Sequence, residues 1–241
     1  FTGGTISMRH DDAAGGNVPA LAGSDLLATV PDLDGIADVI PIDHGLTPAS
    51  HFQFPALFAI QRSVAEALAR DDVDGAVVVQ GTDAIEETAF LLDLLHGGRK
   101  PIVVTGAMRA AGDPAYDGPA DLTAAVRLAA SREAAIADLG AVVLLDGSIE
   151  AADDVTKTHA SAFDTFRALN RGSLGRVGEQ GVALAGPRGP RRHVDADRAA
   201  ERVYLVTATV ATTGAPIAAL HAHGADGFVV AATGAGNTDP R

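Results

Sequence analysis

The fold is decided by residues 76–95, which read Ala-Val-Val-Val-Gln-Gly-Thr-Asp-Ala-Ile-Glu-Glu-Thr-Ala-Phe-Leu-Leu-Asp-Leu-Leu. The opening run is short and β-branched, as is typical of a buried strand. From Ala84 to Leu95 the apolar side chains recur at helical spacing, with Ile85 and Leu92 on one face. A strand is therefore expected to feed directly into a helix.

The same strand-and-helix pattern recurs along the chain. Residues 101–105 and 140–145 read as buried strands, and 119–131 reads as a helix with proline in its first turn. Later segments repeat the pattern at 203–207, 216–223 and 227–232. Alternation with short connections predicts an α/β fold with a mainly parallel sheet covered on both faces.

The domain organisation follows from a change in composition. Residues 186–192, Gly-Pro-Arg-Gly-Pro-Arg-Arg, mix turn formers with charge. We therefore expect an N-terminal catalytic domain over 1–185, a linker over 186–202 and the start of a smaller α/β domain over 203–241. The chain opens on a turn with no strand before it and stops after a strand-to-turn junction, so both ends are expected to be incomplete.

Composition excludes several classes of partner. The 31 acidic and 18 basic residues give a net charge of -13, which repels polyphosphate, and no basic stretch carries aromatics, so no nucleic acid is expected. No apolar run approaches the roughly 18 residues of a membrane span, so no membrane is expected. The chain has no cysteine, and its histidines lack ligand spacing, so no metal is predicted.

Ligands of open parallel sheets bind beyond the carboxyl ends of the strands, which directs attention to four loops. One loop, residues 2–7, places two threonine hydroxyls around a glycine pair; it is either an ordinary turn or a backbone that offers its amides to an oxyanion. In another, Asp83 and Glu86 have the spacing of a helix cap, although a carboxylate there could also hold an amino acid's charged group.

Two further segments, one around Lys157 and one rich in glycine, contain candidate functional residues. Lys157 lies between two threonines; it is either a solvated surface charge or, if buried beside Asp83, a group that could take a hydroxyl proton. Residues 233–237 begin like a dinucleotide fingerprint, but Asp239 occupies the place of the third glycine. A nucleotide-binding oxidoreductase is therefore the weakest interpretation, and no cofactor is predicted.

Taken in order, these segments resemble the bacterial-type L-asparaginases. The matching stretches are residues 2–7, 80–95, 103–109, 117–119, 154–158 and 234–237. The resemblance implies a flavodoxin-like large domain and a smaller α/β domain, assembled as a homotetramer or dimer in which the active site is shared between subunits. It implies an amidohydrolase that converts L-asparagine to L-aspartate and ammonia, with glutamine as a possible side substrate. Independently of the resemblance, a cytoplasmic location is expected.

The resemblance also assigns roles to individual residues. Thr5 matches the family's primary nucleophile, and Thr82, Asp83 and Lys157 match a second catalytic cluster, in which Asp83 would also hold the substrate's α-ammonium group. The remaining matches are expected to bind substrate: Asp43, His44, Gly81, Ala107 and, reaching into a neighbouring subunit's site, Asn237.

Three departures from the family pattern leave other functions open. The stretch corresponding to the family's mobile lid, residues 8–24, lacks a tyrosine, and Tyr116 and Tyr204 lie elsewhere. Asp43 and His44 stand where the family favours a serine and a polar residue, and the family's glutamate from the small domain would lie beyond Arg241. The alternatives are an asparagine-binding or sensor protein without turnover and an amidase subunit of the amidotransferase type.

Overall fold

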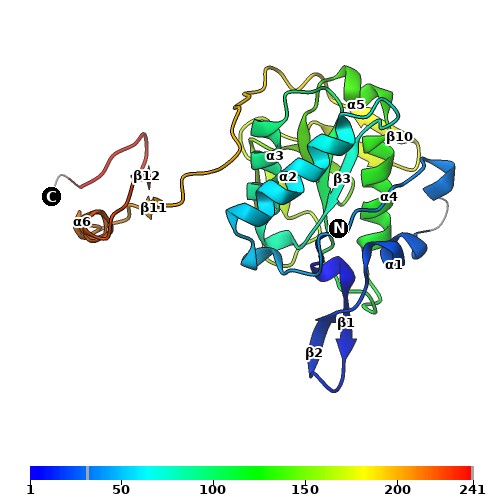
Figure 1. The fold of residues 1–241 in the computed structure, drawn as a ribbon, viewed down its shortest axis with the longest axis horizontal. Helices are drawn as coiled ribbons and strands as arrows, with labels where there is room; N and C mark the ends of the chain where they lie inside the picture. The colour runs from blue at the N-terminus through cyan, green and yellow to red at the C-terminus, as the bar shows by residue number, and fades with distance from the viewer. Residues whose placement is uncertain (31–32, 240–241) are drawn as a thin grey trace. The chain divides into compact units, whose positions relative to one another are not determined.

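A computed structural model describes residues 1–30 and 33–239. The chain divides into two compact units, Phe1–Ala196 and Asp197–Arg241, which we describe separately (Figure 1). This boundary falls inside the expected linker. Arg188 belongs to the first unit, where its side chain is buried and its Nη1 and Nη2 atoms donate to both carboxylate oxygens of Asp93, at 2.7 and 2.8 Å.

The first unit is built around a six-stranded sheet, with strand order β10-β9-β6-β5-β4-β3. The strands are β3 (Ala76–Val79), β4 (Ile102–Thr105), β5 (Ala141–Leu145), β6 (Ser148–Ala151), β9 (Gly175–Gly178) and β10 (Gly181–Leu184). The α/β class predicted from the sequence is confirmed. The strands at 76–80, 101–105 and 140–145 form within one residue of the expected bounds.

The sheet is mixed, however, so the prediction of a mainly parallel sheet is wrong. Strands β3, β4 and β5 are mutually parallel, but β5 pairs with β6, β6 with β9 and β9 with β10 in antiparallel fashion. The reversal begins at Asp146-Gly147, where φ is 49° and 69°. Two consecutive residues of positive φ form the tight turn of a two-residue hairpin, and Asp-Gly is a preferred sequence for it.

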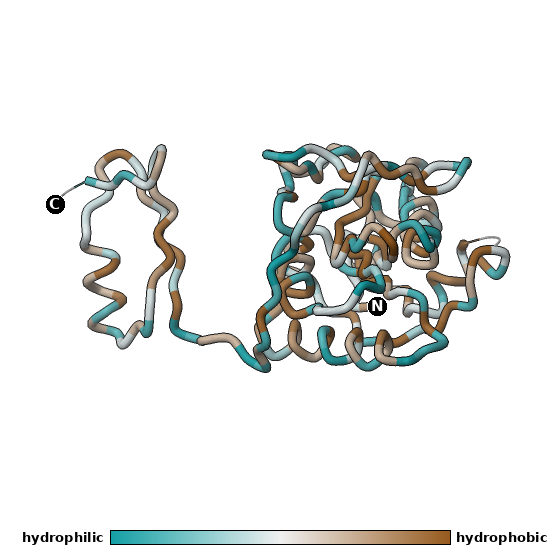
Figure 2. The backbone as a smooth tube through the Cα atoms, turned by 90° about the horizontal axis from the view of Figure 1, so that it is seen from above, coloured by the Kyte–Doolittle hydropathy of each residue, from teal (hydrophilic) through white to brown (hydrophobic). Residues whose placement is uncertain are grey.

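Helices cover both faces of the sheet. The helices α2 (Phe54–Leu68) and α3 (Ile85–Leu95) pack on one face, and α4 (Gly118–Ala129) and α5 (Arg132–Ile136) pack on the other. Alternate residues of β4 point to opposite cores, as the two-residue period of a strand requires. The apolar stretches of the chain accordingly run through the interior of this unit (Figure 2).

Smaller elements surround the sheet. At the N-terminus a single 3-10 turn, η1 (Thr5–Ser7), leads into a hairpin of β1 (Met8–Asp11) and β2 (Gly16–Pro19). The other short elements are α1 (Gly23–Ala28), η2 (Leu33–Gly35), η3 (Ala49–His51), η4 (Thr82–Ala84) and the antiparallel pair β7 (Val155–Lys157) and β8 (Phe166–Ala168).

The second unit contains two parallel strands joined by a helix. These are β11 (Val203–Thr207), α6 (Ala215–Ala222) and β12 (Gly227–Ala231), close to the bounds expected from the sequence. Among its described residues, Val206 alone is a buried hydrophobic side chain.

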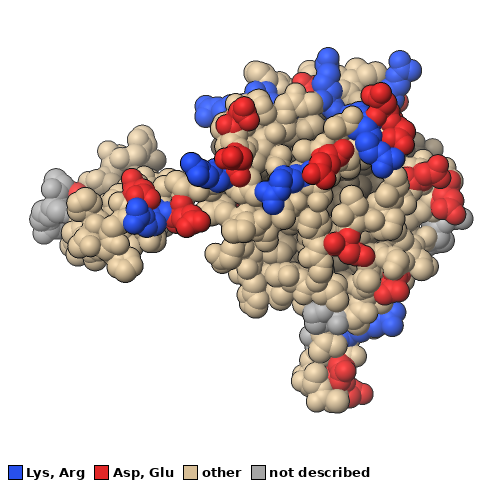
Figure 3. All heavy atoms as spheres, viewed as in Figure 1, with Lys and Arg blue, Asp and Glu red and all other residues tan. Residues whose placement is uncertain are grey.

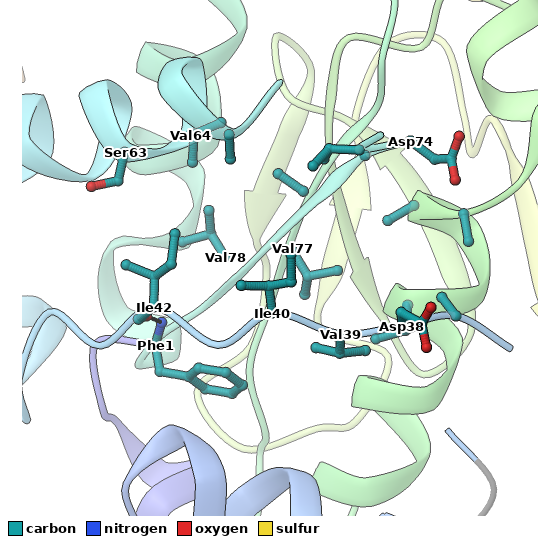
Figure 4. Close-up of a pocket in the computed structure, with 18 of the residues that line it drawn as sticks. Phe1, Asp38, Val39, Ile40, Ile42, Ser63, Val64, Asp74, Val77 and Val78 are labelled. Carbon is teal, nitrogen blue, oxygen red and sulfur yellow. Dashed lines mark hydrogen bonds between the residues drawn. The ribbon is translucent and has the colours of Figure 1, made fainter. Parts of the chain in front are cut away.

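A groove of about 410 Å³, lined by both apolar and charged side chains, runs along β3, the edge strand of the large sheet. Figure 4 shows Val77 and Val78 of β3 and, on the preceding loop, Val39, Ile40 and Ile42 among the residues that line this groove. Thr82, Asp83 and Lys157 are not among the residues that line it. The groove is therefore separate from the candidate catalytic cluster.

Candidate active site

Lys157 reaches the carboxyl end of β3 from a strand that lies far along the chain. Its Nζ donates to Thr82 Oγ1 over 2.8 Å and lies 3.5 Å from Asp83 Oδ1. Thr82 is buried, and the Lys157 side chain is only 20 % exposed. The structure therefore places this lysine in a largely buried position beside Thr82 and Asp83.

The spacing of Asp83 and Glu86 is that of a helix cap, but Asp83 does not cap helix α3. The N-cap is Ala84, and no side chain of the described residues makes a capping hydrogen bond there. Glu86 instead accepts from the backbone amide of Lys157 over 2.7 Å, which fixes β7 against the start of α3. The Asp83 side chain is 66 % exposed and therefore open to a ligand.

The glycine pair of the opening motif allows two backbones to touch. Gly3 and Gly4 adopt φ of 96° and 95°, which side chains disfavour. A Cβ at Gly4 would lie 2.2 Å from the amide nitrogen of Gly81. The residues that directly precede Thr5 and Thr82 therefore lie in contact, and the two threonine loops are neighbours at one edge of the sheet.

The loop after β4 closes the same region. A Cβ at Gly106 would lie 2.5 Å from the Gln80 carbonyl oxygen and 3.3 Å from the Thr82 methyl group. Ala107, which follows it, is buried. Asp117 holds the rest of this loop, because its carboxylate accepts from the backbone amides of Met108 and Arg109 at 2.8 and 2.9 Å.

The loop that contains Asp43 and His44 packs on the opening motif. The amide of Thr47 donates to the Thr2 carbonyl over 2.9 Å. Asp43 accepts from the amide of Gly23 over 3.1 Å, and His44 lines the groove beside β3. Burial lowers the pKa of His44 below its usual 6.5, so this side chain is neutral at pH 7 and does not offset the charge of Asp43.

Thr5 lines a hollow of about 820 Å³ together with Met108, Arg109 and Tyr116. Tyr116 is a residue that the sequence reasoning missed, because it lies far from the lid stretch in which a tyrosine was sought. Its hydroxyl donates to the carbonyl of Ile6, next to Thr5, over 2.6 Å. Only the fold brings Tyr116 to this place, and no local pattern in the sequence marks it.

Asn237 lies in the second unit, in a tight turn in which its amide donates to the Thr233 carbonyl over 2.9 Å. The assignment of Asn237 to a substrate site therefore stays a prediction. Asn17, the residue nearest to the expected lid tyrosine, has a side chain that lies outside the described part of the structure.

The distribution of charged and metal-ligating side chains is a further feature of the surface. On the face shown in Figure 3, basic side chains alternate with acidic ones instead of forming a patch. Within residues 1–30 and 33–239, no three His, Asp or Glu side chains are grouped so as to hold a metal ion. No helix in that same part of the chain is long and apolar enough to cross a membrane.

Comparison with known proteins gives the family of the chain. Residues 1–188 match the model of the N-terminal domain of asparaginases. The chain belongs to the asparaginase family. This match confirms the resemblance to asparaginases over residues 1–188, which are most of the first unit.

Curated relatives give the same assignment. L-asparaginase 2-3 of Saccharomyces cerevisiae is 36 % identical over 188 residues, which are 77 % of this chain and 51 % of the yeast protein. An L-asparaginase of Bacillus licheniformis is 31 % identical over 241 residues, 99 % of this chain and 73 % of the relative. The chain thus spans about half the length of the first of these relatives and about three quarters of the second.

A solved structure supports the fold. The crystal structure of a probable cytoplasmic L-asparaginase from Campylobacter jejuni superposes with a TM-score of 0.89 at 29 % sequence identity. The match covers 98 % of this chain and 74 % of the other. The mixed six-stranded α/β architecture is therefore that of a known asparaginase-family member.

Proposed function

We propose that this asparaginase-family chain is the catalytic part of an L-asparaginase, which hydrolyses the side-chain amide of L-asparagine to L-aspartate and ammonia. The observation that carries the proposal is the 2.8 Å hydrogen bond from Lys157 to Thr82, at a site where Asp83 remains exposed. A threonine, a lysine and a carboxylate grouped in this way match the needs of nucleophilic acyl transfer.

The proposed mechanism begins with attack of the Thr5 hydroxyl on the side-chain carbonyl. A C–O bond forms, the hydroxyl proton passes to the amide nitrogen, and ammonia leaves. Water then cleaves the acyl ester and restores Thr5. Backbone amides near the glycine pair or at the start of α3 would stabilise the oxyanion in both steps. These groups act without a cofactor.

Substrate binding is assigned to groups around the same edge of the sheet. Asp83 would hold the α-ammonium group, and the backbones of Gly81 and Ala107 would contact the amide. Asp43 and His44 would lie near the α-carboxylate, a role in which the neutral His44 can offer a hydrogen bond but not a charge. The proposal includes glutamine, which has one more methylene, as a side substrate, and ammonia release measured from each amide gives the preference.

The assembly and the location complete the proposal. We infer a homotetramer or dimer in which Asn237 reaches the site of a neighbouring subunit. The finer fold assignment is a flavodoxin-like large domain with a smaller α/β domain, divided near residues 186–202. A cytoplasmic location is in line with the description of the Campylobacter jejuni relative as probably cytoplasmic.

The chain offers a matched test, because it contains two lysines, Lys157 and Lys100. Lys100 donates to the carbonyls of Leu68 and Arg70, away from the candidate cluster. We expect Lys157→Met to lower the rate of ammonia release from asparagine by about 10³-fold or more, because the only cation beside Thr82 among the described residues is lost. Lys100→Met should retain the wild-type rate per folded molecule.

The threonines are tested in the same assay. Thr5→Ala and Thr82→Ala should each reduce kcat by several orders of magnitude. Thr123→Ala should not, because the Thr123 hydroxyl is half-buried on α4 and donates to the Pro119 carbonyl of the same helix. Full rates in both Thr5→Ala and Thr82→Ala would show that the residues are wrongly assigned. Saturable binding of asparagine without any release of ammonia would instead favour the sensor function.

A further inference from the structure

The turn that contains Thr5 is held by hydrogen bonds to each of its carbonyls. The Gly4 carbonyl accepts from the amide and the hydroxyl of Ser7, at 2.9 and 2.8 Å. The Thr5 carbonyl accepts from the amide of Met8. The Ile6 carbonyl accepts from Tyr116 Oη over 2.6 Å, from a loop 110 residues away in sequence.

Tyr116 is itself fixed in place. Its ring lies against Gly118, where a Cβ would come within 2.4 Å of Tyr116 Oη and 2.5 Å of the ring carbons. Packing of this kind limits the ring to a narrow range of orientations. The hydroxyl is therefore presented to Ile6 by a rigid support.

The neighbouring residue ties the same support to the second loop of the site. Asp117 accepts from the amides of Met108 and Arg109, directly after Ala107. Residues 116–117 thus hold both the turn that carries Thr5 and the loop that carries Ala107. Thr5 and Tyr116 also line one hollow.

We propose that Tyr116 is a positioning residue for Thr5, whose hydroxyl bond to the Ile6 carbonyl holds the 3-10 turn in the orientation from which Thr5 attacks the substrate. This inference rests on the proposed function, in which Thr5 is the nucleophile. It assigns Tyr116 no contact with the reacting atoms. Small displacements of a nucleophile reduce the rate strongly, so a residue that fixes the turn affects turnover.

Tyr116 does not serve as the proton acceptor that the lid tyrosine of the family would supply. Burial, with a smaller effect of the Asp117 charge, raises the pKa of Tyr116 to about 12. The phenol therefore keeps its proton near neutral pH, and that proton is engaged with the Ile6 carbonyl. Its chemistry is that of a hydrogen-bond donor.

The test is Tyr116→Phe, which keeps the ring on Gly118 and removes only the hydroxyl. We expect kcat for ammonia release from asparagine to fall by about 10-fold to 100-fold, with KM within about twofold of the wild type, because the nucleophile and not the binding groups is displaced. The matched control is Tyr204→Phe, which removes a phenol hydroxyl from β11 in the second unit. An unchanged kcat in Tyr116→Phe, with or without a lower unfolding temperature, would overturn the proposal.

Hydrogen exchange separates this proposal from the proposed function. Loss of one hydrogen bond from the turn should speed exchange of the Ser7 and Met8 amides by about fivefold to tenfold, with no such change in Tyr204→Phe. Wild-type protein that releases no ammonia would contradict the proposed function, while the exchange result would still decide whether Tyr116 holds the turn. Unchanged exchange of these amides would refute that role for Tyr116.

Discussion

At the scale of single residues, Asp121 is a buried acid that the proposed chemistry does not use. It lies on α4, is 4 % exposed and accepts from the amide of Asp146 over 2.9 Å. Burial, with a smaller contribution from the charge of Asp117, raises the pKa of Asp121 to about 8. The folded protein therefore keeps this carboxyl protonated at pH values where the unfolded chain ionises it.

This difference predicts a pH-dependent stability. The contribution of Asp121 is present in full below its unfolded pKa, near 4, and is lost as the pH rises to about 8. Asp121→Asn imitates the protonated acid, so the variant should exceed the wild type in free energy of unfolding at pH 8 by on the order of 1–4 kcal/mol, and by much less at pH 5. Urea unfolding at both pH values measures the difference, and a variant whose advantage does not grow with pH contradicts it. Exposed Asp71→Asn is the control.

Residues of the candidate site could be predicted from the sequence only where they lie in a short local motif. Thr82 and Asp83 were found because they end a strand, and Lys157 because it is a lysine between threonines; the structure brings these three together. The hydrogen bonds of Glu86 and Tyr116 could not be foreseen, since they depend on contacts between segments 71 and 110 residues apart. The spacing of Asp83 and Glu86 alone does not show whether Glu86 belongs to a helix cap or holds strand β7 in place.

At the scale of elements, the Asp146-Gly147 turn decides the direction of half the sheet. A Cβ at Gly147 would lie 2.7 Å from the carbonyl oxygen of Val177 on β9, and its φ of 69° is unfavourable for any side chain. The turn therefore needs glycine both for its own conformation and for the approach of β9. Strand order beyond β5 depends on it.

We predict that Gly147→Ala lowers the free energy of unfolding by about 1–3 kcal/mol. Gly178→Ala, on β9 itself, should change it little, because nothing lies within 4 Å of the added methyl group and its φ is not in the left-handed region. Urea denaturation followed by circular dichroism compares the two. An equal effect of both substitutions would show that the positive φ of Gly147 and its approach to Val177 are not the reason for the loss of stability.

The positions of the strands and helices along the chain were easier to predict than the directions in which the strands run. The helix α3 was located within one residue because its apolar side chains recur at helical spacing, and β4 was located because it is a short, continuous β-branched run. The antiparallel half of the sheet was missed because periodicity carries no information on strand direction. That information lay in the Asp146-Gly147 pair, a turn signal that was not used.

At the scale of the whole molecule, the two units differ in how much core they possess. The first unit has buried clusters on both faces of its sheet. In the second, Leu205 is 69 % and Val229 56 % exposed, and helix α6 buries none of its residues. A pair of strands with one helix seldom covers enough apolar surface to be stable alone.

The final prediction concerns the units in isolation. Residues 1–196 expressed alone should unfold cooperatively, whereas residues 197–241 alone should give no sigmoidal transition, because Val206 is the one buried hydrophobic side chain described in that unit. Thermal denaturation followed by far-ultraviolet circular dichroism distinguishes the two. A cooperative transition in residues 197–241 would show that this unit folds without further surface to pack on. Its absence would show that residues 197–241 need apolar surface from outside this segment in order to fold.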